Sequence, residues 1–93
     1  MARTKELIKR SEARIITYIL NADKHRRRGD AISEKLNIDY IYVMKLLGQM
    51  YNKGWLKTHK YDGVIYFALT LRTPIEEAKK RLIQGGIQCQ LRS

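Results

Sequence analysis

Apolar residues near the start of the chain recur at the spacing of one face of an α-helix, with Lys, Arg, Ser and Glu between them. This pattern predicts a first helix over about residues 4–22. Asn21 and Asp23 are weak helix formers and suit its end. The apolar positions of this helix are Leu7, Ile8, Ile15, Ile16, Ile19 and Leu20.

A short second helix is expected after a basic loop, residues 24–28, and a glycine hinge at Gly29. Asp30 is the predicted N-cap, because its short carboxylate can accept from a free backbone N–H of the first turn. The buried side of this helix is formed by Ala31, Ile32 and Leu36. Asn37 suits the left-handed position that ends a helix, where it commonly replaces glycine.

A third helix is predicted over residues 40–52, with Asp39 as its N-cap and with the Ile38 side chain packed into the preceding turn. At about 100° per residue, the core face contains Val43, Leu46, Leu47 and Met50. The opposite face contains Ile41, Tyr42, Lys45, Gly48, Gln49 and Asn52. An isoleucine, a tyrosine and a glycine are unusual on a merely solvated face, and they fit a face that meets a groove. Gly48 is explained by close approach of a partner's backbone or by packing against the hairpin.

The segment after Gly54 alternates in the manner of a β-hairpin. Residues 55–60 and 64–69 are the two predicted strands, and residues 61–63 are the turn. Asp62-Gly63 between such strands is a strong short-range hairpin signal. On the second strand, we expect the core face to contain Ile65, Phe67 and Leu69.

A fourth helix is predicted from a capping box with Thr73 at the N-cap, Pro74 at the first helical position and Glu76 at the third. Its apolar side contains Ile75, Ala78, Leu82 and Ile83. Gly85-Gly86 is expected to end it, and the alternating residues 87–91 could then form a strand. The whole chain is interpreted as one domain, residues 1–93, with residues 1–4 and 87–93 as flexible or dimer-associated tails.

The charge balance points to a polyanionic partner. Lys and Arg number 19 against 9 Asp and Glu, which gives a formal net charge of +10. No apolar run approaches the length that spans a membrane, and residues 1–6 do not resemble a signal peptide. We therefore expect an intracellular protein with no membrane partner.

The order of helix, helix, helix and hairpin resembles the winged helix-turn-helix DNA-binding domains of small prokaryotic and archaeal transcriptional regulators. The resemblance covers about residues 15–69 and is carried by residues 31–38, by Val43, Leu47 and Met50, and by residues 53–56. Size and charge look most like the compact regulators encoded by viruses of Sulfolobus and other hyperthermophilic archaea. For a viral protein, the location would be the host cytoplasm.

The resemblance implies an α+β fold: a three-helix core, a two-stranded β-hairpin wing and a C-terminal helix. It also implies a homodimer on double-stranded DNA, with two third helices in successive major grooves about 34–36 Å apart and the wings on adjacent backbone or minor groove. The first and fourth helices, which carry apolar stripes, are the expected dimer surfaces. The runner-up interpretation is a winged-helix module that binds RNA or a protein partner.

The candidate DNA contacts combine phosphate-neutralising cations with polar groups that can pair with base edges. Lys45, Gln49 and Asn52 are the candidates for base edges, and the tyrosines are candidates for phosphates. Tyr40 could equally pack at the margin of the core. The full set is Arg26, Arg27, Arg28, Tyr40, Tyr42, Lys45, Gln49, Asn52, Lys57, His59, Lys60 and Tyr61.

Catalysis has little support in the sequence, so we expect no enzyme, no cofactor and no small-molecule effector. His25 and His59 have no neighbouring ligand at metal-binding spacing. Cys89 is the single cysteine, so it is either a free thiol or joined to the same residue of a second subunit. In an extended tail, Ile87, Cys89 and Leu91 would share a face that pairs across a two-fold axis. Disulfides inside cells are known from hyperthermophiles.

Overall fold

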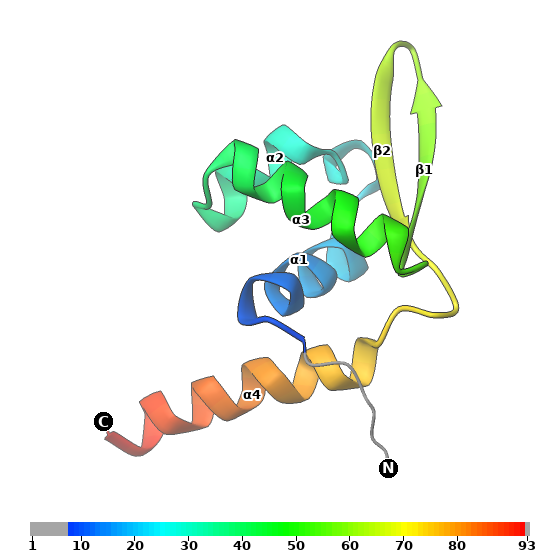
Figure 1. The fold of residues 1–93 in the computed structure, drawn as a ribbon. Coiled ribbons are helices and arrows are strands. Elements are labelled where there is room, and N and C mark those ends of the chain that lie inside the picture. Colours follow the sequence, from blue (N-terminus) through cyan, green and yellow to red (C-terminus); the bar gives the residue numbers. More distant parts are fainter. Residues whose placement is uncertain (1–7, 93) are drawn as a thin grey trace.

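The computed structural model describes the backbone of residues 8–92 and the side chains of residues 8–83. Four α-helices, one short 3₁₀ turn and one β-hairpin follow each other along the described chain (Figure 1). They are α1 (Arg10–Asn21), η1 (Lys24–Arg26), α2 (Gly29–Leu36), α3 (Tyr40–Asn52), β1 (Leu56–Tyr61), β2 (Val64–Leu69) and α4 (Ile75–Arg92). The predicted α+β order, with a hairpin between the third and fourth helices, is confirmed.

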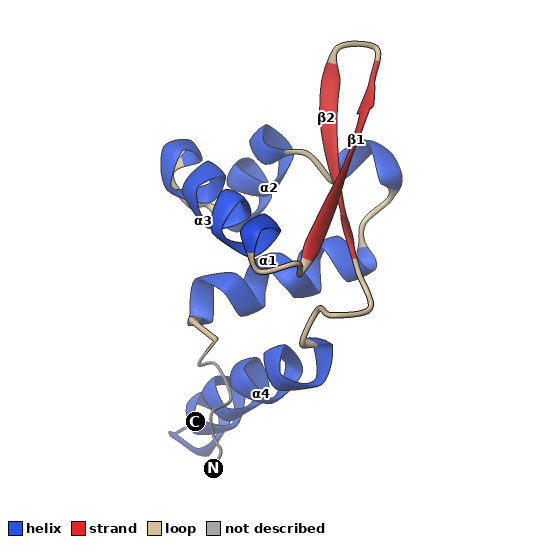
Figure 2. Ribbon diagram, turned by 45° about the vertical axis from the view of Figure 1, so that its right-hand side comes forward, coloured by secondary structure: helices blue, strands red, loops and turns tan. Residues whose placement is uncertain are grey.

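Helix α1 lies at the centre of the molecule, between α4 on one side and the α2–α3 pair on the other (Figures 1 and 2). It begins at Arg10, later than predicted, because Ile8 and Lys9 precede the first turn and the Lys9 N–H donates to Oε1 of Glu12 at 3.0 Å. Its apolar stripe is buried within the single chain, which leaves little of it for a second subunit. The buried residues are Ala13, Ile15, Ile16 and Ile19.

The turn between α2 and α3 follows the local signals closely. Asn37 ends α2 with a left-handed φ of 58°, as predicted. The Asp39 carboxylate accepts from the Tyr42 N–H at 3.2 Å, which confirms the cap of α3. Asp30 is not the N-cap of α2. Arg28 occupies that position, and Asp30 lies inside the first turn, where an acidic side chain suits the helix dipole.

The hairpin is a two-stranded antiparallel wing that extends away from the helices (Figure 2). Asp62 and Gly63 both have positive φ, 54° and 78°, so they form a two-residue turn whose twist suits a hairpin. Tyr61, predicted in the turn, belongs to β1 and pairs with Val64. Only the base of the wing is anchored.

The wing contributes Phe67 and Leu69 to the core, as predicted, but not Ile65. Phe67 is buried and Leu69 is half-buried against the core, whereas Ile65 is 48% exposed. Ile65 shares their face of β2, but it pairs with Lys60, near the tip. The wing therefore projects beyond the core at this point, and alternation along the strand could not reveal where the core ends.

Helix α4 differs from the prediction at both ends. It begins at Ile75, one position later than a Thr73 cap requires, and the Thr73 hydroxyl instead donates to the Trp55 carbonyl. It continues through Gly85 and Gly86 to Arg92, so the predicted helix stop and the predicted strand are both wrong. The side chain of Cys89 lies outside the described residues, and an extended tail is no longer a basis for its pairing.

No helix within the described residues is long and apolar enough to cross a membrane.

Candidate nucleic-acid interface

One side of helix α3 packs on the core and the opposite side faces solvent. Val43, Leu46, Leu47 and Met50 are buried, as the sequence predicted, and they fix which side of the helix faces the core. On the opposite side, four exposed residues lie along one line, which we call the outer line of α3: Ile41, Lys45, Gly48 and Asn52. Gln49 and Tyr42 lie beside this line, with Gln49 half-buried. This side of α3 is open for contact with another molecule.

Gly48 is on that outer line, and nothing in the structure fills the space that a side chain would take. A Cβ built at Gly48 meets no atom within 4 Å outside its own helix. Packing against the hairpin, one of the two explanations offered by the sequence, is therefore excluded for the residues that the structure describes. Close approach of a partner's backbone, the other explanation, stays a prediction.

Tyrosines flank the outer line of α3. Tyr40 lies at the margin, half exposed, with its ring close to Gly29 of α2, where a Cβ would lie 3.4 Å from a ring carbon. Tyr51 is as exposed as Tyr40 but is absent from the predicted contacts. Its distance of three helical turns from Tyr40 places both on one side of α3, so helical spacing could have revealed it.

The wing carries its polar residues on two different faces. Lys57, His59 and Tyr61 share one face of β1, across from Ala68, Tyr66 and Val64 respectively. Lys60 lies on the other face, opposite Ile65. All four predicted wing residues are exposed, and Lys57 and Lys60 place one positive charge on each face of the hairpin.

The three arginines of the basic loop have three different surroundings. Arg26 is exposed. Arg27 is half-buried and donates through Nε to the Ala22 carbonyl at 3.0 Å. Arg28 donates through Nε to Oδ1 of Asp30 at 2.8 Å and through a terminal nitrogen to the His25 carbonyl. Both Arg27 and Arg28 thus stabilise the loop, a role that was not predicted from the sequence.

Asp30 also affects the charge of Arg28. Its hydrogen bond and its negative charge raise the pKa of the Arg28 guanidinium above the ordinary value, with a smaller contribution from Tyr66. Arginine is protonated throughout the physiological range in any case. The negative charge of Asp30 therefore offsets part of the positive charge that Arg28 can offer to a phosphate.

The structure brings the basic loop and the wing together. The Phe67 N–H donates to the Arg27 carbonyl at 2.7 Å and ties β2 to the loop. Beside this bond lies a hollow of about 460 Å³, which we call the wing notch. It is lined by Lys24, His25, Arg27, His59, Tyr61, Tyr66, Phe67 and Ala68. Lys24 and Arg27 bring positive charge to this lining and none of the lining side chains is acidic, so the charge of the notch favours an anion.

The two histidines therefore line one cationic notch, although they are far apart in the sequence. Neither belongs to a group of His, Cys, Asp or Glu that could hold a metal ion, within the side chains that the structure describes. Tyr66 was not among the predicted contacts, because the approach of loop and wing depends on tertiary packing.

No family model matches the chain, and no curated protein matches it. Among solved structures, the chain is similar to a single-residue mutant of ZitR from Lactococcus lactis, with a TM-score of 0.71 and 18% sequence identity. The match covers 98% of this chain and 63% of the ZitR chain, so this chain spans under two thirds of that protein. The expected likeness to regulators encoded by Sulfolobus viruses, such as the winged-helix protein of the Sulfolobus turreted icosahedral virus, is not supported. The fold of the chain is that of a winged helix, as predicted.

Proposed function

We propose that this protein binds double-stranded DNA sequence-selectively and acts as a homodimeric transcriptional regulator. The observation that carries the proposal is the outer line of α3, which is free of intramolecular packing and lies beside a cationic wing. A formal net charge of +10 supplies the affinity for a polyanion. The fold is shared with ZitR, a winged-helix transcriptional regulator of the MarR family, which supports the same class of function.

In this proposal α3 enters the major groove, because an α-helix fits its width and each base pair presents a distinct pattern there. Lys45, Gln49 and Asn52 read base edges, and Tyr40 and Tyr42 donate to phosphates. The wing lies on adjacent backbone or in the minor groove, with Lys57, His59, Lys60 and Tyr61 as its contacts. Arg26 adds a phosphate contact from the loop, whereas Arg27 and Arg28 mainly hold the loop in place.

The proposed dimer uses α4. The apolar stripe of α1 is buried inside the single chain, so α1 is a weaker candidate than the sequence suggested. Helix α4 lies at the edge of the molecule, and Ile83 on it is exposed (Figure 1). Two copies of α3 would then lie about one turn of DNA, roughly 34–36 Å, apart. The Cys89 disulfide stays a prediction, tested by the migration of the chain on a non-reducing denaturing gel.

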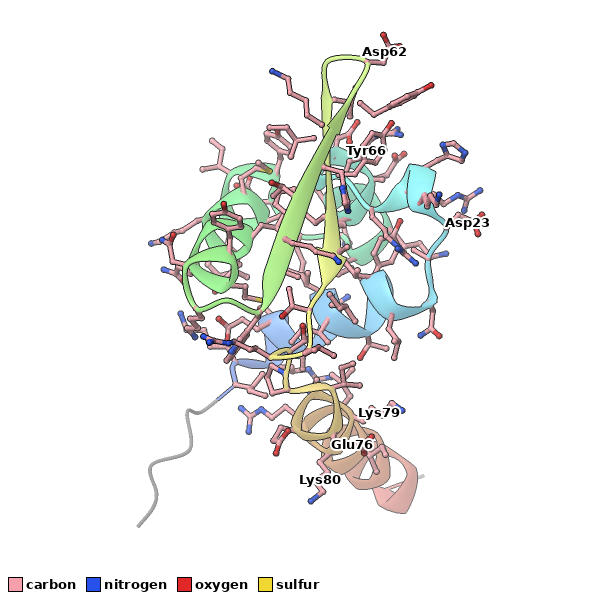
Figure 3. All side chains as sticks on the ribbon, turned by 90° about the vertical axis from the view of Figure 1, so that its right-hand side faces the viewer. Asp23, Asp62, Tyr66, Glu76, Lys79 and Lys80 are labelled. Carbon is pink, nitrogen blue, oxygen red and sulfur yellow. The ribbon has the colours of Figure 1, made fainter. Side chains whose placement is uncertain are left out.

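The wing supplies the sharpest test, because the chain offers a matched control. Lys57→Gln with Lys60→Gln removes two charges from the wing. Lys79→Gln with Lys80→Gln removes two charges from α4, at the opposite end of the molecule (Figure 3). We expect the wing variant to weaken duplex binding and to reduce the slope of log affinity against log salt by about 2 per protomer, or about 4 for the proposed dimer. The α4 variant should leave that slope nearly unchanged.

Fluorescence anisotropy over a series of KCl concentrations, with sedimentation to check the oligomeric state, measures both variants. Equal weakening by the two variants would mean that only overall charge attracts the duplex, and the proposed interface would be wrong. Competition with RNA and with random duplex tests the alternative. A protein that prefers RNA, or that selects no duplex from a random pool, is not the regulator proposed here.

A further inference from the structure

The outer line of α3 contains an exposed aliphatic side chain that the proposed contacts leave unused. Ile41 is the second residue of α3 and is 76% exposed, more than Tyr40 or Tyr42 on either side of it. It shares the line with Lys45, one helical turn further on. A β-branched residue is a poor helix former, so neither packing nor helix propensity explains its position.

Gly48 stands on the same line, two helical turns after Ile41, which is a separation of about 10.5 Å along the axis. Glycine inside a helix costs about 1 kcal/mol relative to alanine, and no neighbouring atom in the structure requires it. Its lack of a side chain lets the middle of α3 come closer to a surface than any other residue would. The line thus combines a protruding methyl-bearing side chain at the start of the helix with a flat position at its middle.

This inference rests on the proposed DNA binding, in which Ile41 lies in the major groove. The observations then identify the group on the DNA that Ile41 contacts. The base pairs of the major groove present donors and acceptors and one apolar group, the C5-methyl of thymine. In helix-turn-helix proteins the N-terminal part of the recognition helix contacts base edges, which is where Ile41 lies. Polar Lys45 and Asn52 cannot replace this contact, because they need a hydrogen-bonding edge.

We propose that Ile41 selects a thymine in each half-site by contact with its C5-methyl group, and that Gly48 permits the close approach which this contact needs. This contact would make part of the sequence specificity independent of the positive charges that bind phosphates. It concerns one methyl group per half-site, and it leaves the phosphate contacts of the wing unchanged.

The test begins with duplexes that the full chain selects from a random pool. Deoxyuridine then replaces each thymine in turn, which removes the methyl and keeps the base pairing. Replacement of one particular thymine in a half-site should lower the affinity of the wild type for that duplex roughly fourfold, which corresponds to the loss of one buried methyl group. Ile41→Ala should bind the thymine duplex less tightly than the wild type does. It should bind the thymine duplex and the deoxyuridine duplex with the same affinity. Ile41→Val is the matched control and should retain most of the discrimination.

Gly48→Ala provides an independent readout. We expect it to raise the midpoint of thermal unfolding, because alanine is the better helix former, while it weakens binding to the selected duplex at least severalfold. A Gly48→Ala variant that is less stable, or that binds as well as the wild type, overturns the role given to Gly48.

The outcomes separate this inference from the proposed function. Failure to select any duplex contradicts DNA recognition itself. Selection followed by equal deoxyuridine effects in the wild type and in Ile41→Ala contradicts the thymine contact alone. The unfolding midpoint of Ile41→Val should match the wild type and that of Ile41→Ala should be equal or slightly higher, since the side chain is exposed and alanine is the better helix former.

Discussion

At the scale of single residues, Glu12 shows how a charge can be built into the core. Only 1% of its surface is exposed. Its Oε1 accepts from the Lys9 N–H, and its Oε2 lies 3.5 Å from Nζ of Lys53, which stands 4.3 Å from the centre of the Trp55 ring. The carboxylate thus joins the start of α1 to the residue that ends α3. It holds α3 against the centre of the molecule.

The two halves of this ion pair should not be equivalent. Lys53→Met leaves a buried carboxylate without its counter-charge, whereas Glu12→Gln removes the buried charge and still accepts from Lys9. In Glu12→Gln the ammonium of Lys53, whose side chain is 32% exposed, can turn to solvent. We expect the free energy of unfolding to fall by about 2 kcal/mol for Lys53→Met and by about 1 kcal/mol for Glu12→Gln. Urea denaturation measures both, and the reverse order would contradict the burial of Glu12.

The sequence could not reveal this pair. Glu12 occupies a polar position between apolar ones, where solvent exposure is the normal expectation. Its partner is 41 residues away, so nothing local distinguishes it from Glu34. Asn37 and Asp39, in contrast, were predicted correctly, because their partners lie within the same turn.

At the scale of elements, the connection between wing and α4 depends on two threonine hydroxyls. The Thr73 hydroxyl donates to the Trp55 carbonyl and accepts from the Thr70 N–H at 2.8 Å. The Thr70 hydroxyl donates to the Gly54 carbonyl at 2.6 Å. Together they join the entry of β1 to the exit of β2. The base of the wing is thus closed by side chains.

This arrangement predicts different effects from those of a capping box. Thr73→Val leaves the Trp55 carbonyl and the Thr70 N–H without their partner, so the free energy of unfolding should fall by about 1–3 kcal/mol. Thr73→Ser keeps the hydroxyl and Glu76→Ala touches none of these bonds, so each should cost about 0.5 kcal/mol or less. Thermal and urea unfolding of the three variants decides between the two arrangements. A large loss in Glu76→Ala would restore the capping box.

The elements also show where sequence signals are sufficient. Helix α3 was predicted with both of its boundaries, because Asp39 caps one end, Gly54 follows the other, and the buried and exposed faces are clearly separated. The end of α4 was wrong because Gly85-Gly86 was interpreted as a stop. Each glycine costs only about 1 kcal/mol relative to alanine, and no proline follows them to end the helix.

At the scale of the whole molecule, positive charge is spread over both ends. The wing and the basic loop are at one end and Lys79 and Lys80 of α4 are at the other (Figure 3). The formal net charge of +10 already counts the acidic partners in the described ion pairs, Arg28–Asp30 and Lys53–Glu12, so a full excess of ten positive charges remains. The folded chain therefore repels itself, a property that composition alone predicts, whereas the grouping of loop and wing around one notch required the tertiary structure.

Self-repulsion and DNA binding should respond to salt in opposite directions. From about 50 mM to about 500 mM KCl, screening of like charges should raise the free energy of unfolding by about 1 kcal/mol. Over the same range the proposed affinity for duplex DNA should fall steeply, because each counterion released into a more concentrated solution gains less entropy. Urea denaturation and anisotropy in identical buffers measure the two quantities. The variant carrying Lys79→Gln and Lys80→Gln should be more stable at low salt and less sensitive to KCl, with its salt slope for DNA preserved. A free energy of unfolding that falls with KCl would instead show that ion pairs outweigh the repulsion.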